Sequence, residues 1–323
     1  MANDGDYRLG HGYDIGPFNL AGYISVIGSI PTTGTKTLEL DDLSIFANGH
    51  VSSYINPFVE AELTHFDISG SSVAGAHREQ GEIAVERLYN DINVNGSFTL
   101  RLGKMLAPVG EWNQIHAAPL VLTTVRPDVT YRNFSEYATG VSVLYSDATA
   151  SYPDVQVYWQ PDGEFSERSS RIAPHRYRSV IGAHVSFPAG LLDKIGVSFQ
   201  HSKDMRGSKQ SLLGIDFHYT VEGLTLEGEG TYSHNSKSNN TILRTNEWGA
   251  YAAASYALTD KWSIFGWYEG FTERTVAEAT HNLLLGAAYR PHPAVAFKFE
   301  YLRNMDGPSV KPEGLYGSWS VLF

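Results

Sequence analysis

The chain contains no cysteine and no long apolar run, and charged residues are scarce in it. Without cysteine it has neither a disulfide framework nor a thiolate that could bind a metal or act as a nucleophile. Charged residues make up 18 % of its 323 residues, below the roughly 25 % of an ordinary soluble domain. No stretch approaches the roughly 20 consecutive apolar residues of a membrane helix. This excludes helical spans and leaves transmembrane strands, which need an apolar residue only at every second position.

Basic residues are fewer than acidic ones, and the formal net charge is −11 at pH 7. A general nucleic-acid binder needs a basic surface, so nucleic acid is not an expected partner. No glycine-rich phosphate loop follows a strand-like segment and opens a helix. The 12 histidines show no spacing typical of a metal site or of a catalytic triad. We therefore expect no cofactor, no metal site, no catalytic residue and no enzymatic activity.

Alternation of apolar and polar residues is the dominant pattern, and it is strictest in LGIDFHYT, residues 213–220. Sixteen such segments occur, many of them close to the 9–11 residues that a tilted strand needs to cross a bilayer. An even number of this size is typical of outer-membrane barrels. The pattern predicts an all-β, 16-stranded antiparallel transmembrane β-barrel. Its segments are 18–30, 37–48, 54–69, 82–91, 97–104, 138–146, 152–160, 177–187, 194–203, 211–222, 224–235, 247–258, 262–272, 281–290, 295–304 and 315–323.

The two ends of the chain support this division. The last nine residues, LYGSWSVLF, alternate up to the final aromatic, which is expected of a strand that pairs on both edges in a closed barrel. The first ten, MANDGDYRLG, lack the basic and apolar regions of a signal peptide. Residues 1–17 are therefore predicted to be an N-terminal segment, either of a mature exported protein or of one that never had a signal, and residues 18–323 to form the barrel.

Connections after even-numbered segments are mostly short and those after odd-numbered segments longer, as expected when both termini lie on one side of the membrane. One connection, residues 105–137, is far longer than the others. Loops of this length are usually functional or disordered, and this one is too apolar and aromatic for a disordered segment. We expect this third long loop to fold into the lumen.

The entrance to that loop resembles a known family. Tyr89, the strand end Arg101-Leu102-Gly103-Lys104 and the following Pro108-Val109-Gly110 are similar to the strand–turn–strand that leads into the third loop of Gram-negative porins, especially the phosphate-selective type. The resemblance implies a channel in the outer membrane, and the final Phe323 resembles the terminal aromatic of porins. The lysine-rich ladder of the phosphate-selective type has no counterpart here, so phosphate as the solute is left open.

The polar face of each strand in such a barrel points into the lumen. The apolar phase of the segments places eight acidic and four basic residues there, which predicts a weak preference for cations. A phase change at Asp41-Asp42 predicts a β-bulge. The candidates for lumen charge are Glu60, Glu62, Asp216, Glu227, Glu229, Lys298 and Glu300, and the count also includes Glu39, Asp41, Arg101, Arg178 and Arg290.

Five residues are candidates for a constriction: Arg101, Glu111, Arg126, Asp128 and Arg132. Opposed charges across a narrow pore would orient polar solutes. Alternatively, Arg126 and Asp128 pair with each other around Pro127 and hold the shape of the loop. Asp216 and His218 fall two apart on one inward face, and we interpret them as a lumen hydrogen bond rather than as an acid–base pair.

The sequence therefore predicts an outer-membrane porin through which small hydrophilic solutes or ions diffuse, with membrane lipid and lipopolysaccharide around it and a homotrimer as its possible assembly. Three alternatives stay open: an anion- or phosphate-selective porin, a barrel enzyme of the outer membrane, and a barrel that sheathes an electron-transfer partner.

Overall fold

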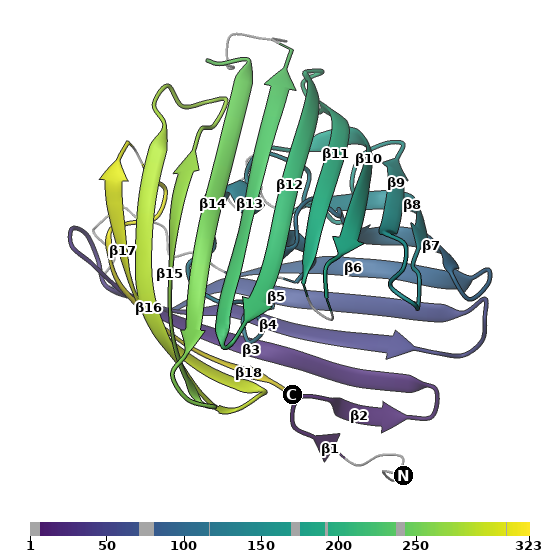
Figure 1. The fold of residues 1–323 in the computed structure, drawn as a ribbon, viewed down its shortest axis with the longest axis horizontal. Coiled ribbons are helices and arrows are strands. Elements are labelled where there is room, and N and C mark those ends of the chain that lie inside the picture. The colour runs from purple at the N-terminus through teal and green to yellow at the C-terminus, as the bar shows by residue number, and fades with distance from the viewer. Residues whose placement is uncertain are drawn as a thin grey trace.

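A computed structural model describes residues 7–70, 81–115, 117–168, 175–190, 193–236, 243–307 and 309–323. The strands form one antiparallel sheet that closes on itself as a barrel (Figure 1). Sixteen long strands, β3 to β18, make the wall in chain order, and each of the sixteen predicted segments corresponds to one of them. The all-β barrel predicted from the alternation is confirmed.

The wall strands end within a few residues of the predicted bounds. They are β3 Phe18–Pro31, β4 Thr37–Gly49, β5 Asn56–Gly70, β6 Glu82–Asn93, β7 Phe98–Leu106, β8 Tyr137–Tyr145, β9 Asp154–Gln160, β10 Tyr177–Pro188, β11 Lys194–Asp204, β12 Lys209–Val221, β13 Leu224–Asn235, β14 Asn246–Ala257, β15 Trp262–Phe271, β16 Thr280–His292, β17 Val295–Asp306 and β18 Gly314–Leu322.

The barrel closes between its first and last long strands, β3 and β18. Their register runs from Gly314 opposite Pro31 to Leu322 opposite Tyr23. Beyond the end of β18, the backbone of Phe323 exchanges two hydrogen bonds with Gly22, at 2.8 and 2.7 Å. The final aromatic thus belongs to the seam. The short strands β1 (Tyr7–Arg8) and β2 (Gly12–Ile15) continue the sheet beside the start of β3.

The two faces of the wall differ as the alternation predicts. On β12 the apolar Leu213, Ile215 and Phe217 are exposed on the outside by 58, 57 and 40 %, whereas Asp216 between them is 1 % exposed. The outside is therefore a belt of apolar and aromatic side chains, and the buried polar side chains lie inside. Among the described residues, no helix is long and apolar enough to span a membrane.

Irregularities in the ladder concentrate in β3 to β6. The register of β3 with β4 passes from Ser25–Asp42 to Val26–Leu40 and so skips Asp41, which confirms the predicted bulge.

On β10, a register shift between Tyr177 and Ser179 leaves Arg178 with a side chain that is 60 % exposed. The prediction that Arg178 faces the lumen is therefore wrong, because this bulge interrupts the alternation on which it rested.

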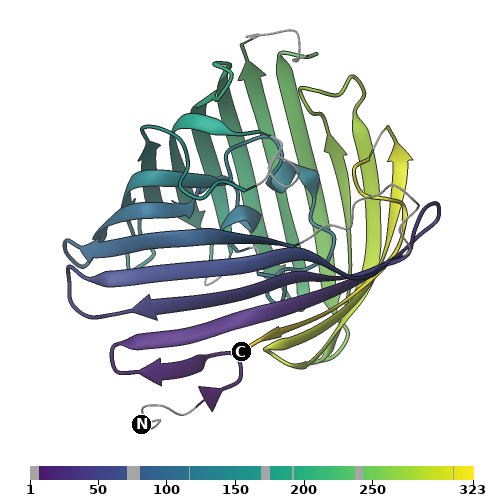
Figure 2. The same ribbon diagram turned by 180° about the vertical axis from the view of Figure 1, so that it is seen from behind.

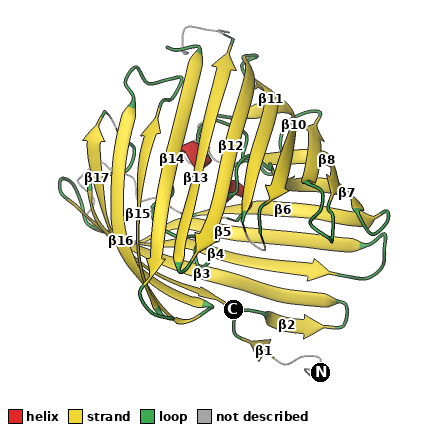
Figure 3. Cartoon of the chain, viewed as in Figure 1, coloured by secondary structure: helices red, strands yellow, loops and turns green. Residues whose placement is uncertain are grey.

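The third long connection lies inside the barrel, as expected. It runs over residues 107–136 between β7 and β8 and contains two short 3-10 helices, η1 (Trp112–Gln114) and η2 (Asp128–Thr130). Figure 2 shows this segment from behind, in front of the inner face of the strands β11 to β15, and Figure 3 marks its helices within the barrel outline. We call residues 107–136 the lumen loop.

Candidate functional site

Three wall carboxylates hold the lumen loop by its backbone. Glu229 on β13 accepts hydrogen bonds from the backbone N–H groups of Glu111 and Trp112 at 3.0 and 2.6 Å. Glu300 on β17 accepts those of Thr124 and Val125, at 2.5 and 3.0 Å. Between them, Glu269 on β15 accepts the N–H of Val129 at 2.8 Å. A charged acceptor makes a stronger hydrogen bond than a neutral one, so these contacts fix the height of the loop in the barrel.

Two basic side chains hold the carbonyl groups of the same loop. Lys298 Nζ donates to the backbone oxygens of Ala118 and Val121 at 2.9 and 2.8 Å. Arg290 Nη1 donates to Pro119 O at 2.5 Å. Acceptors and donors of the wall thus satisfy backbone groups that would otherwise be buried without partners.

Apolar packing completes this attachment. Trp112, Val125 and Val129 of the loop lie in a buried cluster with inward-facing aromatic and aliphatic residues of β14 to β17. The rings of Trp112 and Tyr251 meet nearly edge to face, with centroids 6.0 Å apart. The side of the lumen formed by these strands is therefore filled.

The opposite side of the lumen keeps an open cavity of about 510 Å³, which we call the lumen cavity. It lies between the lumen loop and the wall of β18, β3, β4 and β5. Acidic residues line it on the wall and basic residues mainly on the loops. The acids include Glu39, Asp41, Asp42 and Glu62, and the bases include Arg126, Arg132, Arg168, Lys298 and Lys311.

Four of these basic side chains are paired with acids of the chain. Arg126 contacts Glu136 at 3.1 Å, Arg132 contacts Glu273 at 2.6 Å, and Lys311 contacts Asp128 at 2.8 Å. Arg168 forms ion pairs with both Glu62 and Glu86. The alternative pairing of Arg126 with Asp128 is therefore not found, and each of the two residues has another partner. Arg126 also donates to Thr130 Oγ1 and Thr130 O, at 2.9 and 2.6 Å, so it does support the shape of the loop.

Asp41 and Asp42 differ from these paired groups. Neither carboxylate forms an ion pair with any residue that the structure describes, and Asp42 accepts a hydrogen bond from the neutral hydroxyl of Thr64 at 2.9 Å. The bulge at Asp41 turns two consecutive acidic residues toward the lumen cavity. The uncompensated charge of the cavity is therefore negative and lies on β4.

Two further constriction candidates lie away from this cavity. Arg101 forms a two-pronged ion pair with Asp91, with both contacts at 2.8 Å, and stacks over the ring of Tyr89 at 3.9 Å. Glu111, which belongs to the lumen loop, pairs with Lys194 of β11 at 2.8 Å. Of the five constriction candidates, Arg126 and Arg132 line the lumen cavity, and Asp128 contacts it through its partner Lys311. Neither Arg101 nor Glu111 lines it.

The remaining lumen-charge candidates are also inside the barrel. Glu60 is 1 % exposed and accepts hydrogen bonds from Arg87 Nε at 2.5 Å and Ser44 Oγ at 2.7 Å. Glu227 lines a second cavity, of about 150 Å³, under the lumen loop.

Asp216 and His218 are not partners of each other. Asp216 lies 3.8 Å from His184, and His218 lies 3.8 Å from Glu227. The hydrogen bond expected within this pair is replaced by two looser contacts to other strands.

Arg168 and Lys311 were not predicted as site residues. Each comes from a connection, Arg168 after β9 and Lys311 between β17 and β18, where no alternation indicates direction. Both basic groups nevertheless reach into the barrel. The sequence shows that charged residues occur in the connections, but it does not indicate which of them point into the barrel.

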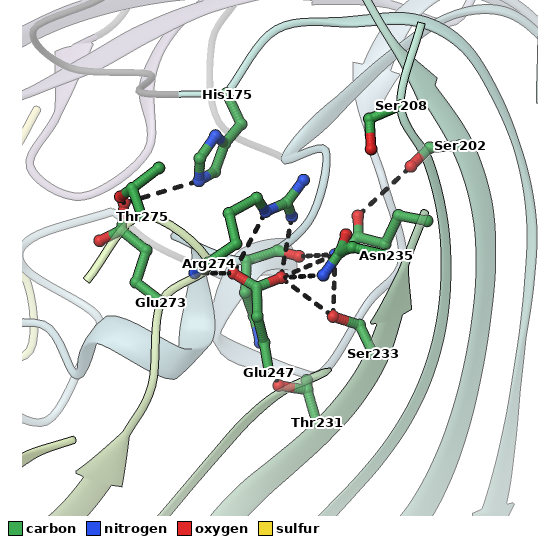
Figure 4. Close-up of polar contacts among 12 residues, drawn as sticks. His175, Ser202, Ser208, Thr231, Ser233, Asn235, Glu247, Glu273, Arg274 and Thr275 are labelled. Atoms are coloured by element: carbon green, nitrogen blue, oxygen red, sulfur yellow. Dashed lines mark hydrogen bonds and ion pairs between the residues drawn. The ribbon is translucent and has the colours of Figure 1, made fainter. Parts of the chain in front are cut away.

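A buried polar network surrounds the ends of β13, β14 and β15, next to the partner of Arg132 (Figure 4). Glu247 accepts hydrogen bonds from the backbone N–H of Arg274 at 2.6 Å and from Asn235 Nδ2 at 2.8 Å, and it also pairs with the Arg274 guanidinium. Burial raises the pKa of the neighbouring Glu273 carboxyl, but the hydrogen bond to His175 and the charge of Arg132 lower it by more. The net result is a pKa of about 2. Glu273 therefore stays charged and holds Arg132 at neutral pH.

Comparison with known proteins supports the fold. No family model matches the chain. An uncharacterized protein of Aquifex aeolicus is 21 % identical, and the match covers 96 % of this chain and 79 % of that protein. Among solved structures, OmpF of Salmonella typhi in complex with daunomycin matches with a TM-score of 0.68 at 11 % identity, over 97 % of this chain and 98 % of that one.

Two more solved structures share the architecture. A loop-deletion mutant of OmpT, an outer membrane protein of Vibrio cholerae, has a TM-score of 0.67 at 13 % identity, over 95 % of this chain and 99 % of that one. An anion-selective porin from Comamonas acidovorans has a TM-score of 0.63 at 12 % identity, over 94 % and 98 %. The chain therefore has the 16-stranded barrel fold of outer-membrane porins.

Proposed function

We propose that the chain is a passive diffusion channel of the outer membrane that passes small hydrophilic solutes and ions and weakly prefers cations. The observation that carries this proposal is the unequal pairing of charges around the lumen cavity. Arg126, Arg132, Arg168 and Lys311 each have an acidic partner, whereas Asp41 and Asp42 form no ion pair within the described residues. Acidic groups that line a pore favour cations.

The experiment is a reversal-potential measurement in planar bilayers under a salt gradient. The wild-type channel should prefer cations, and the preference should weaken as salt rises, because charges are screened beyond about 8 Å at physiological ionic strength. The double variant Asp41→Asn/Asp42→Asn should shift the potential toward zero. Glu82→Gln, at the start of β6 and away from the cavity lining, is the control.

The same measurement decides the anion-selective alternative, which the basic residues lining the lumen cavity favour. A wild-type preference for anions that disappears when Arg101 and Arg126 are neutralised would contradict the proposal. It would also show that the basic groups outweigh the acidic wall despite their partners.

We further propose a homotrimer as the assembly and a non-enzymatic mechanism. The trimer is supported by the similar fold of OmpT from Vibrio cholerae in a trimer form, with a TM-score of 0.65. Mass determination of the detergent-solubilised protein by light scattering tests it, and a monomer at working concentration would contradict it.

A further inference from the structure

Glu39, Asp41 and His65 form a compact set of metal-ligating side chains on the wall of the lumen cavity. One ligand atom from each lies within 4.8 Å of the others, and all three line the lumen cavity. We propose that these residues bind a divalent transition-metal cation of the Mn²⁺ or Zn²⁺ type. This goes beyond the proposed function, because a diffuse preference for cations needs negative charge only and no ligand geometry.

The set is created by an irregularity in two neighbouring strands. The pairing of β4 with β5 passes from Asp42–Thr64 to Leu40–Phe66, so Asp41 and His65 are opposite each other but outside the ladder. His65 has a φ of 56°, which a residue other than glycine rarely adopts. In a regular ladder, adjacent residues on one strand point to opposite faces. Here Asp41 and Asp42 line the same cavity, and so do Thr64 and His65.

The chemistry of the three donors selects the class of ion. Two carboxylates and one imidazole suit first-row divalent metals, whereas Mg²⁺ and Ca²⁺ prefer sites made of oxygen alone. The carboxylate of Asp41 forms no hydrogen bond or ion pair with a described residue, so its lone pairs remain available. The open cavity beside the set leaves room for water to complete the coordination of the ion.

Two basic groups that line the same cavity are directed to other partners. Arg168 is held by Glu62 and Glu86, and Lys298 is directed to backbone oxygens of the lumen loop. Four carboxylates, Glu39, Asp41, Asp42 and Glu62, share one side of the cavity, and His65 lies close to Glu39 and Asp41. A bound cation would offset the repulsion among these carboxylates.

The test is Mn²⁺ binding to the folded, detergent-solubilised protein, followed by electron paramagnetic resonance. Wild-type protein should bind one Mn²⁺ in a specific site, which Zn²⁺ displaces and Mg²⁺ at equal concentration does not. His65→Gly removes the imidazole but accepts the positive φ, and it should weaken binding at least about tenfold. Asp41→Asn should do the same.

Two variants serve as matched controls. Asp42→Asn removes an acidic group of the same cavity outside the ligand set, and His201→Ala removes an exposed histidine that contacts Ser211. His201→Ala should bind Mn²⁺ within about twofold of wild type, since it removes neither a ligand nor a charge of the cavity. Asp42→Asn removes a nearby negative charge but no ligand, so it should weaken binding less than Asp41→Asn does. Heat-modifiable migration on gels reports whether each variant folds. If His65→Gly does not fold, His65→Asn replaces it, because asparagine also tolerates a positive φ.

Equal binding by wild type and His65→Gly, or weak binding at several sites that follows only the number of carboxylates, would overturn the metal site. Failure of the channel proposal is distinguishable, because it appears in reversal potentials and not in Mn²⁺ binding by protein in detergent.

Discussion

The two sides of the barrel differ in regularity and in what they hold. From β11 to β16 the strands pair without a register shift. Each neighbouring pair from β3 to β6 contains one. The regular side carries Glu229 and Glu269, which bind the backbone of the lumen loop. The irregular side carries Asp41 and His65, which face the lumen cavity.

This difference has a physical reason. A segment inside the barrel must have its backbone groups satisfied, and evenly spaced inward side chains on a regular sheet can meet them at fixed heights. A bulge instead turns an extra residue inward and raises the density of side chains at one place. We infer that the regular side positions the loop together with Glu300 and Lys298 of β17, and that the irregular side gives the cavity its charge.

The largest expected effect comes from removing the positioned segment. Deleting Gly110–Val125 should raise single-channel conductance severalfold, because it clears the filled side of the lumen. The shortened loop can still close, since Leu106 and Tyr137 are paired neighbours on β7 and β8. Glu229 and Glu300 would then face water rather than backbone, so the barrel should keep its heat-modifiable migration. Unchanged conductance of a folded deletion variant would place the loop outside the conducting path.

A second, smaller effect should follow from loosening the loop without shortening it. Glu300→Ala removes the acceptor of two N–H groups, those of Thr124 and Val125. Leaving a buried donor without a partner costs about 1–3 kcal/mol. The variant should show noisier open-channel current and faster proteolysis within the loop. Glu300→Gln, which retains a carbonyl oxygen, is the matched control and should lie close to wild type. If both variants behave alike, the carboxylate does not hold the loop.

The third prediction compares the two sides by charge. Asp41→Asn/Asp42→Asn and Glu227→Gln/Glu229→Gln each remove two negative charges. The first pair borders the open cavity and the second lies at or under the loop, so the first should move the reversal potential toward zero by more. Glu60→Gln/Glu62→Gln is a third comparison, because it would release Arg87 from its partner and leave Arg168 paired with Glu86 alone. A larger shift from the Glu227/Glu229 variant would contradict the assignment of charge to the irregular side.

The fold could be predicted largely from the sequence because side-chain alternation in a membrane barrel has a simple cause. Residues such as Leu213 and Ile215 must face outward and Asp216 inward, so the period alone gives each strand. The bulge at Asp41 was also visible, since it breaks the period. Arg178 was misplaced because it follows a buried Tyr177 at a register shift that leaves no mark in the residue pattern.

The site was predicted less well, because its function depends on partners from distant segments. The alternation indicates that Glu229 and Glu300 face inward, but not that they bind the backbone of a loop. Likewise, nothing near Arg126 in the chain indicates its pairing with Glu136 in preference to Asp128. A count of inward charges therefore omits whether each charge is compensated.

The smallest expected effect concerns the end of the lumen loop that Glu273 holds through Arg132. The pKa of Glu273 is lowered to about 2 in the folded protein, against an ordinary value of about 4.3 for an unperturbed glutamate. A lowered pKa contributes stability that is present above the ordinary value and is lost only as pH falls through about 2. The difference in reversal potential between wild type and Glu273→Gln should therefore stay constant from pH 7 down through the ordinary glutamate pKa of about 4.3, to about pH 3.5.

The variant itself should show a slightly weaker cation preference at every pH in that range, because Arg132 loses its charged partner beside the lumen cavity. Arg132→Gln is the matched control. When Glu273→Gln is added to Arg132→Gln, the change in cation preference should be absent or of the opposite sign, because no Arg132 guanidinium remains to lose its partner. Subtracting the two titrations removes the contribution of the other carboxylates of the barrel. A difference that declines with a midpoint near the ordinary glutamate pKa would mean that Arg132 does not hold Glu273, and the loop would then depend on its wall anchors alone.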